Sequence, residues 1–200
     1  MGLWNPFRDE MMTQKQVILA VGLVFVIAGI AGWIYEELFY RINDGYFSRR
    51  GQGKGPWLPI YGFGTVILLF ATAPVKESLW KVVLLCGLIS GVFEFLVGWA
   101  LYHFFGGLRL WDYNTERWNW GNIGGYVCLR SILVFASAAP AMIYTLVPLI
   151  GRFAHTLRDP AYTMITAVPF GISAADMLSG YVFKGILNAD SVFGKGKKQS

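Results

Sequence analysis

Charged residues are scarce in this sequence: Asp, Glu, Lys and Arg make up 14% of its 200 residues. Soluble domains average roughly one quarter, whereas 55% of the residues here are hydrophobic. This composition excludes an ordinary soluble domain and predicts an integral membrane protein. The net charge of +5 does not indicate nucleic acid as a partner, because the basic residues fall in connections between apolar runs, where membrane loops concentrate them.

Groups for metal or nucleotide chemistry are scarce as well. The two cysteines, Cys86 and Cys128, and the two histidines, His103 and His155, have no second ligand at metal spacing. The sequence has no Walker A pattern, so the chain hydrolyses no ATP by that route. We therefore expect no metal site and no cofactor.

Long apolar runs are what the sequence has instead. About 20 apolar residues cross the hydrocarbon of a membrane, and five runs are candidates: 17–41, 58–74, 79–105, 126–150 and 161–186. The second is short, and the fifth is weakened by Pro169 and Asp176. Asp176 is either a proton or ion ligand or a partner for an arginine. We expect an all-α fold, a polytopic membrane helical bundle of about five transmembrane helices.

An internal repeat appears when the sequence is shifted by 58 positions, which aligns residues 28–38 with 86–96 and Glu36 with Glu94. Each aligned segment continues into a polar, basic loop and a second apolar run. The pattern predicts a tandem two-helix repeat, as found in transporters with parallel repeats. The alternative is a chance match of small and aromatic residues between two apolar helices.

The repeat and the distribution of charge define the expected organisation. In order, the parts are a polar segment at 1–16, two helix–loop–helix repeats at 17–74 and 75–150, a loop and fifth helix at 151–187, and a basic tail at 188–200. Lys and Arg are more frequent on the side of the tail, which predicts a cytoplasmic C-terminus and an N-terminus outside. We expect the bacterial cytoplasmic membrane as the location.

Two glutamates lie within apolar runs, where charged side chains are costly and indicate function. Helical spacing places Glu36 one turn after Gly32 and Glu94 one turn after Ser90. Small neighbours let another helix approach closely, so we expect both glutamates to face a common polar interior. The alternative is that they form purely structural salt bridges with Arg130 and Arg50.

The second apolar run begins with GPWLPIYGFG at 55–64, and glycine and proline are poor helix formers. We interpret this as an irregular, broken helix start whose unpaired N–H groups face an anion, with Arg50 and Lys54 close by. The segment 122–126, followed by Arg130, has the same character. Proline in an ordinary first turn, glycine for helix packing and interfacial aromatic anchors form the alternative.

Together the motifs resemble the CmpB-like family, labelled type IV ABC-transporter permeases. The motifs are GWIYEELFY (32–40), Arg50–Gly51, GPWLPIYGFG (55–64), FEFLVGW (93–99), LRLWDY (108–113) and NIGGYVCL (122–129). The resemblance covers about residues 25–150 and implies a polytopic membrane protein with a supposed ATPase partner.

The leading hypothesis is a membrane transport protein that recognises an anionic or lipid-phosphate group in an intramembrane Glu/Arg cavity. The candidate substrate-binding residues are Glu36, Arg50, Tyr61, Glu94, Arg109, Asp112, Asn122 and Arg130. A membrane-embedded enzyme acting on a lipid or polyprenyl phosphate, with Glu94 or Asp112 as general base, and a structural or assembly subunit remain open. Expected partners are membrane lipids, a separate ATPase subunit and a second copy of the chain.

Overall fold

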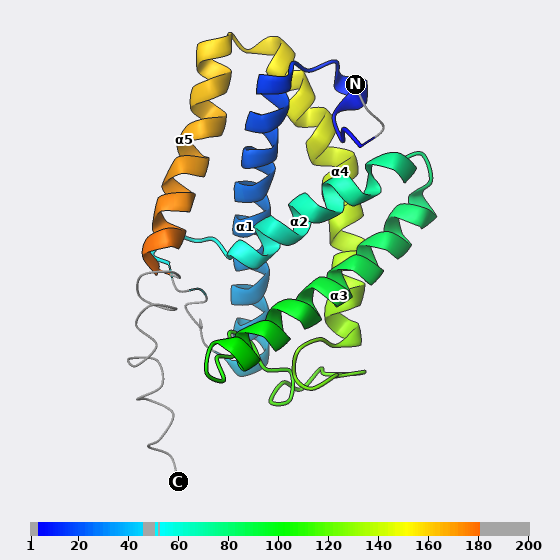
Figure 1. Cartoon of the computed structure of the whole chain (residues 1–200), viewed down its shortest axis with the longest axis vertical. Helices are drawn as coiled ribbons and strands as arrows, with labels where there is room; N and C mark the ends of the chain where they lie inside the picture. Colours follow the sequence, from blue (N-terminus) through cyan, green and yellow to red (C-terminus); the bar gives the residue numbers. More distant parts are fainter. Residues whose placement is uncertain (1–3, 46–50, 52, 181–200) are drawn as a thin grey trace. The chain divides into compact units, whose positions relative to one another are not determined.

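The computed structural model describes residues 4–45, 51 and 53–180. In this part of the chain the elements are helical, which confirms the all-α membrane bundle predicted from the sequence. They are the 3-10 helix η1 (Arg8–Glu10), α1 (Gln14–Asp44), α2 (Pro59–Thr72), the 3-10 helix η2 (Ala73–Val75), α3 (Leu79–Phe104), α4 (Leu129–Thr156) and α5 (Asp159–Met177) (Figure 1).

Four of these helices, α1, α3, α4 and α5, are long and apolar enough to cross a membrane. Helix α2 has 14 residues and spans about 21 Å at 1.5 Å per residue, whereas the hydrocarbon core is about 30 Å thick. The run at 58–74 is therefore helical as predicted, but α2 is too short to cross the hydrocarbon unaided.

Helix α4 extends to Thr156, six residues beyond the expected end at 150. Pro140 and Pro148 lie inside it, which membrane helices tolerate because neighbouring groups satisfy the freed backbone carbonyls. Helix α5 ends at Met177, and the last residues of the predicted fifth span, 181–186, lie outside the described residues.

The chain divides into two compact units. Unit 1 comprises Met1–Met12 and Val66–His155, and unit 2 comprises Thr13–Thr65 and Thr156–Ser200. Each unit has its own buried side chains, such as Tyr162 in unit 2 and Val82 in unit 1.

In unit 2, helices α1 and α5 lie side by side and run in the same direction (Figure 1). Near their starts the Tyr162 hydroxyl donates to the carbonyl oxygen of Gln16 at 3.2 Å. Further along, the rings of Phe25 and Phe170 meet edge to face at 5.8 Å. Thr13 caps α1 by accepting a hydrogen bond from the Gln16 amide at 3.3 Å, which satisfies one donor of the first turn.

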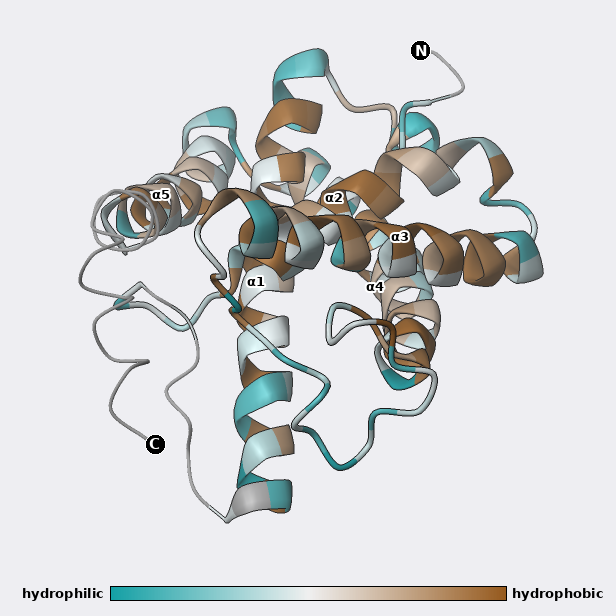
Figure 2. Cartoon of the chain, turned by 60° about the horizontal axis from the view of Figure 1, so that its bottom comes forward, coloured by the Kyte–Doolittle hydropathy of each residue, from teal (hydrophilic) through white to brown (hydrophobic). Residues whose placement is uncertain are grey.

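In unit 1, helices α3 and α4 contact each other at small residues of α3. A Cβ at Gly87 would lie 3.3 Å from Cβ of Ala136, and one at Gly91 would lie 3.0 Å from Cδ1 of Ile132. Another face of α3 exposes apolar side chains at four-residue spacing, at Leu84, Leu88, Val92 and Leu96. Figure 2 shows hydrophobic residues along α3 and hydrophilic ones in the loops, as expected of a helix that faces lipid.

Candidate functional site

Glu36 and Tyr61, two of the predicted substrate-binding residues, lie together in unit 2. The Tyr61 hydroxyl donates a hydrogen bond to Oε1 of Glu36 at 3.1 Å. The Tyr61 ring packs against α1 at Gly32, where a Cβ would lie 2.1 Å from Cγ of the ring. Glycine at this position therefore lets the first turn of α2 approach α1 closely enough for the hydrogen bond to form.

The irregular segment before α2 binds the carboxylate of Asp176, which lies near the end of α5 (Figure 1). The Lys54 amide donates to both carboxylate oxygens, at 3.0 and 2.8 Å. The Gly55 amide and the Trp57 indole Nε1 each donate to Oδ2 at 2.9 Å. Hydrogen bonds to an ionised acceptor are stronger than neutral ones, so this segment is a set of N–H donors holding an anion that the chain itself supplies.

Two glycines make this arrangement possible. A Cβ at Gly53 would lie 2.4 Å from Oδ2 of Asp176, and one at Gly55 would lie 2.1 Å from Cζ2 of Trp57. Without side chains at these positions, the backbone can approach the carboxylate and the indole can turn towards it. The irregular sequence thus permits contacts that a regular helix start would block.

Arg50, predicted to add positive charge beside this segment, lies outside the described residues. The sequence analysis missed Glu37, whose side chain is buried with 5% of the residue exposed. The signal for it was the pair of adjacent glutamates in GWIYEELFY. The repeat aligns Glu36, and not Glu37, with Glu94.

Glu94 is the buried acid of unit 1, with 6% of the residue exposed. Ser131 in the first turn of α4 donates to Oε2 at 2.6 Å, and Tyr113 in the preceding loop donates to Oε1 at 2.5 Å. Burial and the charge of Glu94 raise the pKa of Tyr113 well above its ordinary value of 10.0. The phenol therefore keeps its proton and remains a donor to the carboxylate at physiological pH.

Three more predicted residues, Arg109, Asp112 and Asn122, meet in the loop between α3 and α4. Nη1 of Arg109 donates to Oδ1 of Asp112 at 3.2 Å. The same oxygen accepts from the amide and Nδ2 of Asn114, at 3.0 and 2.8 Å. Asn122 donates to Oδ1 of Asn114 at 2.9 Å and accepts from the Gly125 amide at 2.8 Å. These bonds stabilise the turns of the loop, with Asp112 in the position of a turn cap.

Arg130, the last predicted residue, forms an ion pair with Glu116 of the same loop. Both side chains are largely buried, with 14% and 11% exposed. The guanidinium also lies 5.4 Å from the centre of the Tyr113 ring. It therefore packs against the tyrosine that binds Glu94.

Sequence reasoning missed the partners Tyr113, Ser131 and Glu116. Tyr113 belongs to the LRLWDY motif and Ser131 is adjacent to Arg130, but no periodicity connects either position to Glu94. The described residues contain no group of three or more His, Cys, Asp or Glu side chains able to bind a metal ion.

The sequence profile of a family described as "putative ABC-transporter type IV" (ABC_trans_CmpB) matches residues 23–181. The match extends over most of the chain, and the chain belongs to this family. It is a multi-pass membrane protein of ABC-transporter type. Neither a curated protein nor a solved structure matches the chain.

Proposed function

We propose that this chain is a membrane transport protein that recognises an anionic group at the irregular segment before α2. The family supports the transport class. The observation that carries the anionic specificity is the carboxylate of Asp176, which accepts hydrogen bonds from Lys54, Gly55 and Trp57 at 2.8–3.0 Å. Donors that hold this carboxylate have the chemistry to hold a phosphate or carboxylate oxygen of a ligand.

In this proposal Asp176 is a resident occupant that a ligand displaces. Only molecules in which Asp176 has left the donors can bind the ligand. The apparent affinity is therefore the intrinsic affinity multiplied by the fraction of such molecules. The Lys54 side chain adds a positive charge beside the donors. Arg50, which lies outside the described residues, stays a candidate from the sequence. The hydrogen bond between Tyr61 and Glu36 holds the first turn of α2 in place next to the site.

The wider proposal retains the expectations from the sequence. A separate ATPase subunit supplies the energy, the bacterial cytoplasmic membrane is the location, and the C-terminus lies in the cytoplasm. A single polar cavity shared by Glu36 and Glu94 stays a prediction. Arg109 and Arg130 each form an ion pair with a carboxylate of the loop between α3 and α4, so an anionic ligand would have to share these guanidinium groups with Asp112 and Glu116.

Anion binding by the purified full chain tests the proposal. We expect Asp176→Asn to bind inorganic phosphate or dihexanoyl phosphatidic acid more tightly than the wild type in isothermal titration, because the competing carboxylate is gone. Asp159→Asn, on the same helix and exposed, is the matched control and should leave the affinity unchanged. An Asp176→Asn protein that binds neither anion better than the wild type refutes anion recognition at this segment.

One observation favours a second candidate, a membrane-embedded enzyme. The Ser131 hydroxyl lies 2.6 Å from Oε2 of Glu94, the geometry of a hydroxyl nucleophile beside a carboxylate base. Ser131 is buried, with 6% exposed, so substrate entry would require the loop to open. If this candidate is correct, Ser131→Ala should abolish the turnover of added polyprenyl phosphate while Ser137→Ala, an exposed serine of the same helix, retains it.

A further inference from the structure

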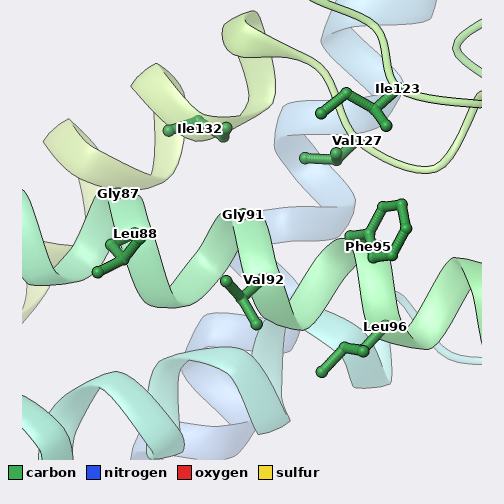
Figure 3. A pocket seen from close by; sticks show the side chains of 9 residues that line it. All are labelled: Gly87, Leu88, Gly91, Val92, Phe95, Leu96, Ile123, Val127 and Ile132. Carbon is green, nitrogen blue, oxygen red and sulfur yellow. The ribbon is translucent and has the colours of Figure 1, made fainter.

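An apolar groove lies beside α3 in unit 1, with a volume of about 540 Å³. The side chains lining it are all apolar. Figure 3 shows α3 along one side and, facing it, residues from the following loop and from α4. The facing residues are Ile123, Val127 and Ile132.

One end of the groove leads to a positive charge. Phe95, which lines the groove, packs edge to face against Tyr126 at 5.6 Å. The guanidinium of Arg109 lies 4.9 Å from the centre of the Tyr126 ring and 4.6 Å from that of Tyr102. The side chains of Phe95 and Tyr126, packed edge to face, therefore lie between the groove and the cation.

The guanidinium of Arg109 has donor groups beyond the one that bonds to Asp112 and Gly124. Within the part of the chain that the structure describes, its hydrogen bonds are made through Nη1, to Oδ1 of Asp112 at 3.2 Å and to the carbonyl of Gly124 at 3.1 Å. The side chain is 25% exposed. The Nε and Nη2 hydrogens thus form a second donor edge, while Asp112 and the two rings hold the guanidinium in place.

The positions of the groove and the cation along the chain match the layers of a membrane. Helix α3 has 26 residues and is about 39 Å long, enough to cross a hydrocarbon core of about 30 Å. The groove is lined by residues 87–96, in the middle of this helix. Arg109 follows the end of the helix at Phe104, and tyrosines such as Tyr102 and Tyr126 are typical of the interface.

We propose that unit 1 binds a phospholipid, with an acyl chain in the groove along α3 and the phosphate on the free donor edge of Arg109. In a membrane, the acyl chain of a phospholipid lies in the hydrocarbon core and its phosphate lies at the interface. The groove and Arg109 are arranged in the same sequence. A guanidinium binds phosphate with two parallel hydrogen bonds. This site is separate from the anion site proposed before α2, and it does not depend on the transport function.

Native mass spectrometry of the purified full chain in detergent tests the headgroup. We expect the wild type to retain dioleoyl phosphatidylglycerol and to lose dioleoylglycerol, which has the same acyl chains and no phosphate. Arg109→Gln should weaken phosphatidylglycerol binding by about tenfold or more, the value of a charge-assisted hydrogen bond. Arg117→Gln, in the same loop and exposed, is the control and should bind as the wild type does.

A second pair of variants tests the groove without altering charge. Ile123→Trp enlarges an exposed side chain on the groove wall and should reduce lipid retention, whereas Leu84→Trp, exposed on α3 but outside the groove, should not. Equal retention of the two lipids, or equal behaviour within either pair of variants, overturns the proposal. A lipid-free dimer that loses its partner with Ile123→Trp would assign the groove to a second copy and also overturn it.

Discussion

Replacing Asp176 by Asn would test whether the carboxylate on the N–H donors before α2 stabilises the fold of unit 2. The substitution keeps the size of the side chain and removes its charge. It also replaces one acceptor oxygen by an NH2 group, which cannot accept from the Lys54 amide. The amides of Lys54 and Gly55 and the indole of Trp57, which all donate to Oδ2, would then share a neutral acceptor.

The expected loss follows from the number of donors. A hydrogen bond to a charged group contributes about 1.5–3 kcal/mol and a neutral one about 1 kcal/mol, so three donors lose about 3 kcal/mol together. Lys54 is exposed to solvent, and solvent screening reduces the loss to about 1.5 kcal/mol. For a chain of this size we expect a decrease in Tm of about 3–6 °C.

Circular dichroism during heating, with the protein in detergent micelles, measures this decrease. The control is Asp159→Asn on the same helix, whose pair with Lys15 at 2.7 Å is exposed at 63% and 55% and should contribute little. Combining Asp176→Asn with Trp57→Phe should cost less than the sum of the two changes, because the first weakens and the second removes the same hydrogen bond. If Asp176→Asn and Asp159→Asn lower Tm equally, the donors contribute no particular stability and our account of this segment is wrong.

Two further predictions concern packing and pH. Gly32→Ala should lower Tm by several degrees and weaken the contact between α1 and α2, because the new Cβ would lie 2.1 Å from the Tyr61 ring. The control is Gly171→Ala. A Cβ at Gly171 would have no atom within 4 Å, so this change should leave Tm unchanged or raise it. Hydrogen bonding and attraction to Lys76 lower the pKa of Asp9 below 3.8, so its contribution is present at neutral pH and is lost as the pH falls below 3.8. Comparing Tm at pH 6 and pH 3 should therefore show a smaller acid-induced decrease for Asp9→Asn than for the wild type.

Much of the helical architecture could be predicted from the sequence, because a segment that crosses lipid needs a long run of apolar residues and a helix that satisfies its own backbone hydrogen bonds. Within the described residues each apolar run contains a helix, and the shortest run, 58–74, contains the 14-residue helix α2. The ends were less predictable. Helix α4 continues past 150 to Thr156. At Gly151 it lies close to Glu10 of the N-terminal segment, a contact that no local pattern indicates.

Individual candidate residues could be named from the sequence, but the groups that they contact could not. The acceptor of the N–H donors before α2 is Asp176, 119 residues beyond Trp57, and neither periodicity nor charge distribution could place it there. Likewise, Arg130 pairs with Glu116, 14 residues earlier in the loop. Sequence patterns identify charged residues whose burial in an apolar run is unfavourable. The partner of each such residue depends on how segments distant in the sequence pack together.

The two aligned glutamates share a chemical environment without sharing equivalent partners. Glu36 accepts from Tyr61 of α2, and Glu94 accepts from Tyr113 of a loop. The shift of 58 positions pairs Tyr61 with Asn119, whose side chain instead donates to the Tyr113 carbonyl at 3.0 Å. The tandem repeat stays a prediction, because the two tyrosine donors do not occupy positions that this shift aligns.

These contacts also bear on which groups would meet an anion. An ionised carboxylate repels an anionic ligand, so Glu36 and Glu94 are better suited to holding tyrosines than to binding the ligand directly. The amides of Lys54 and Gly55 and the indole of Trp57 carry no negative charge and already hold a carboxylate. If the chain transports an anion, we therefore expect these donors to contact it, with the glutamates positioning the structure around them.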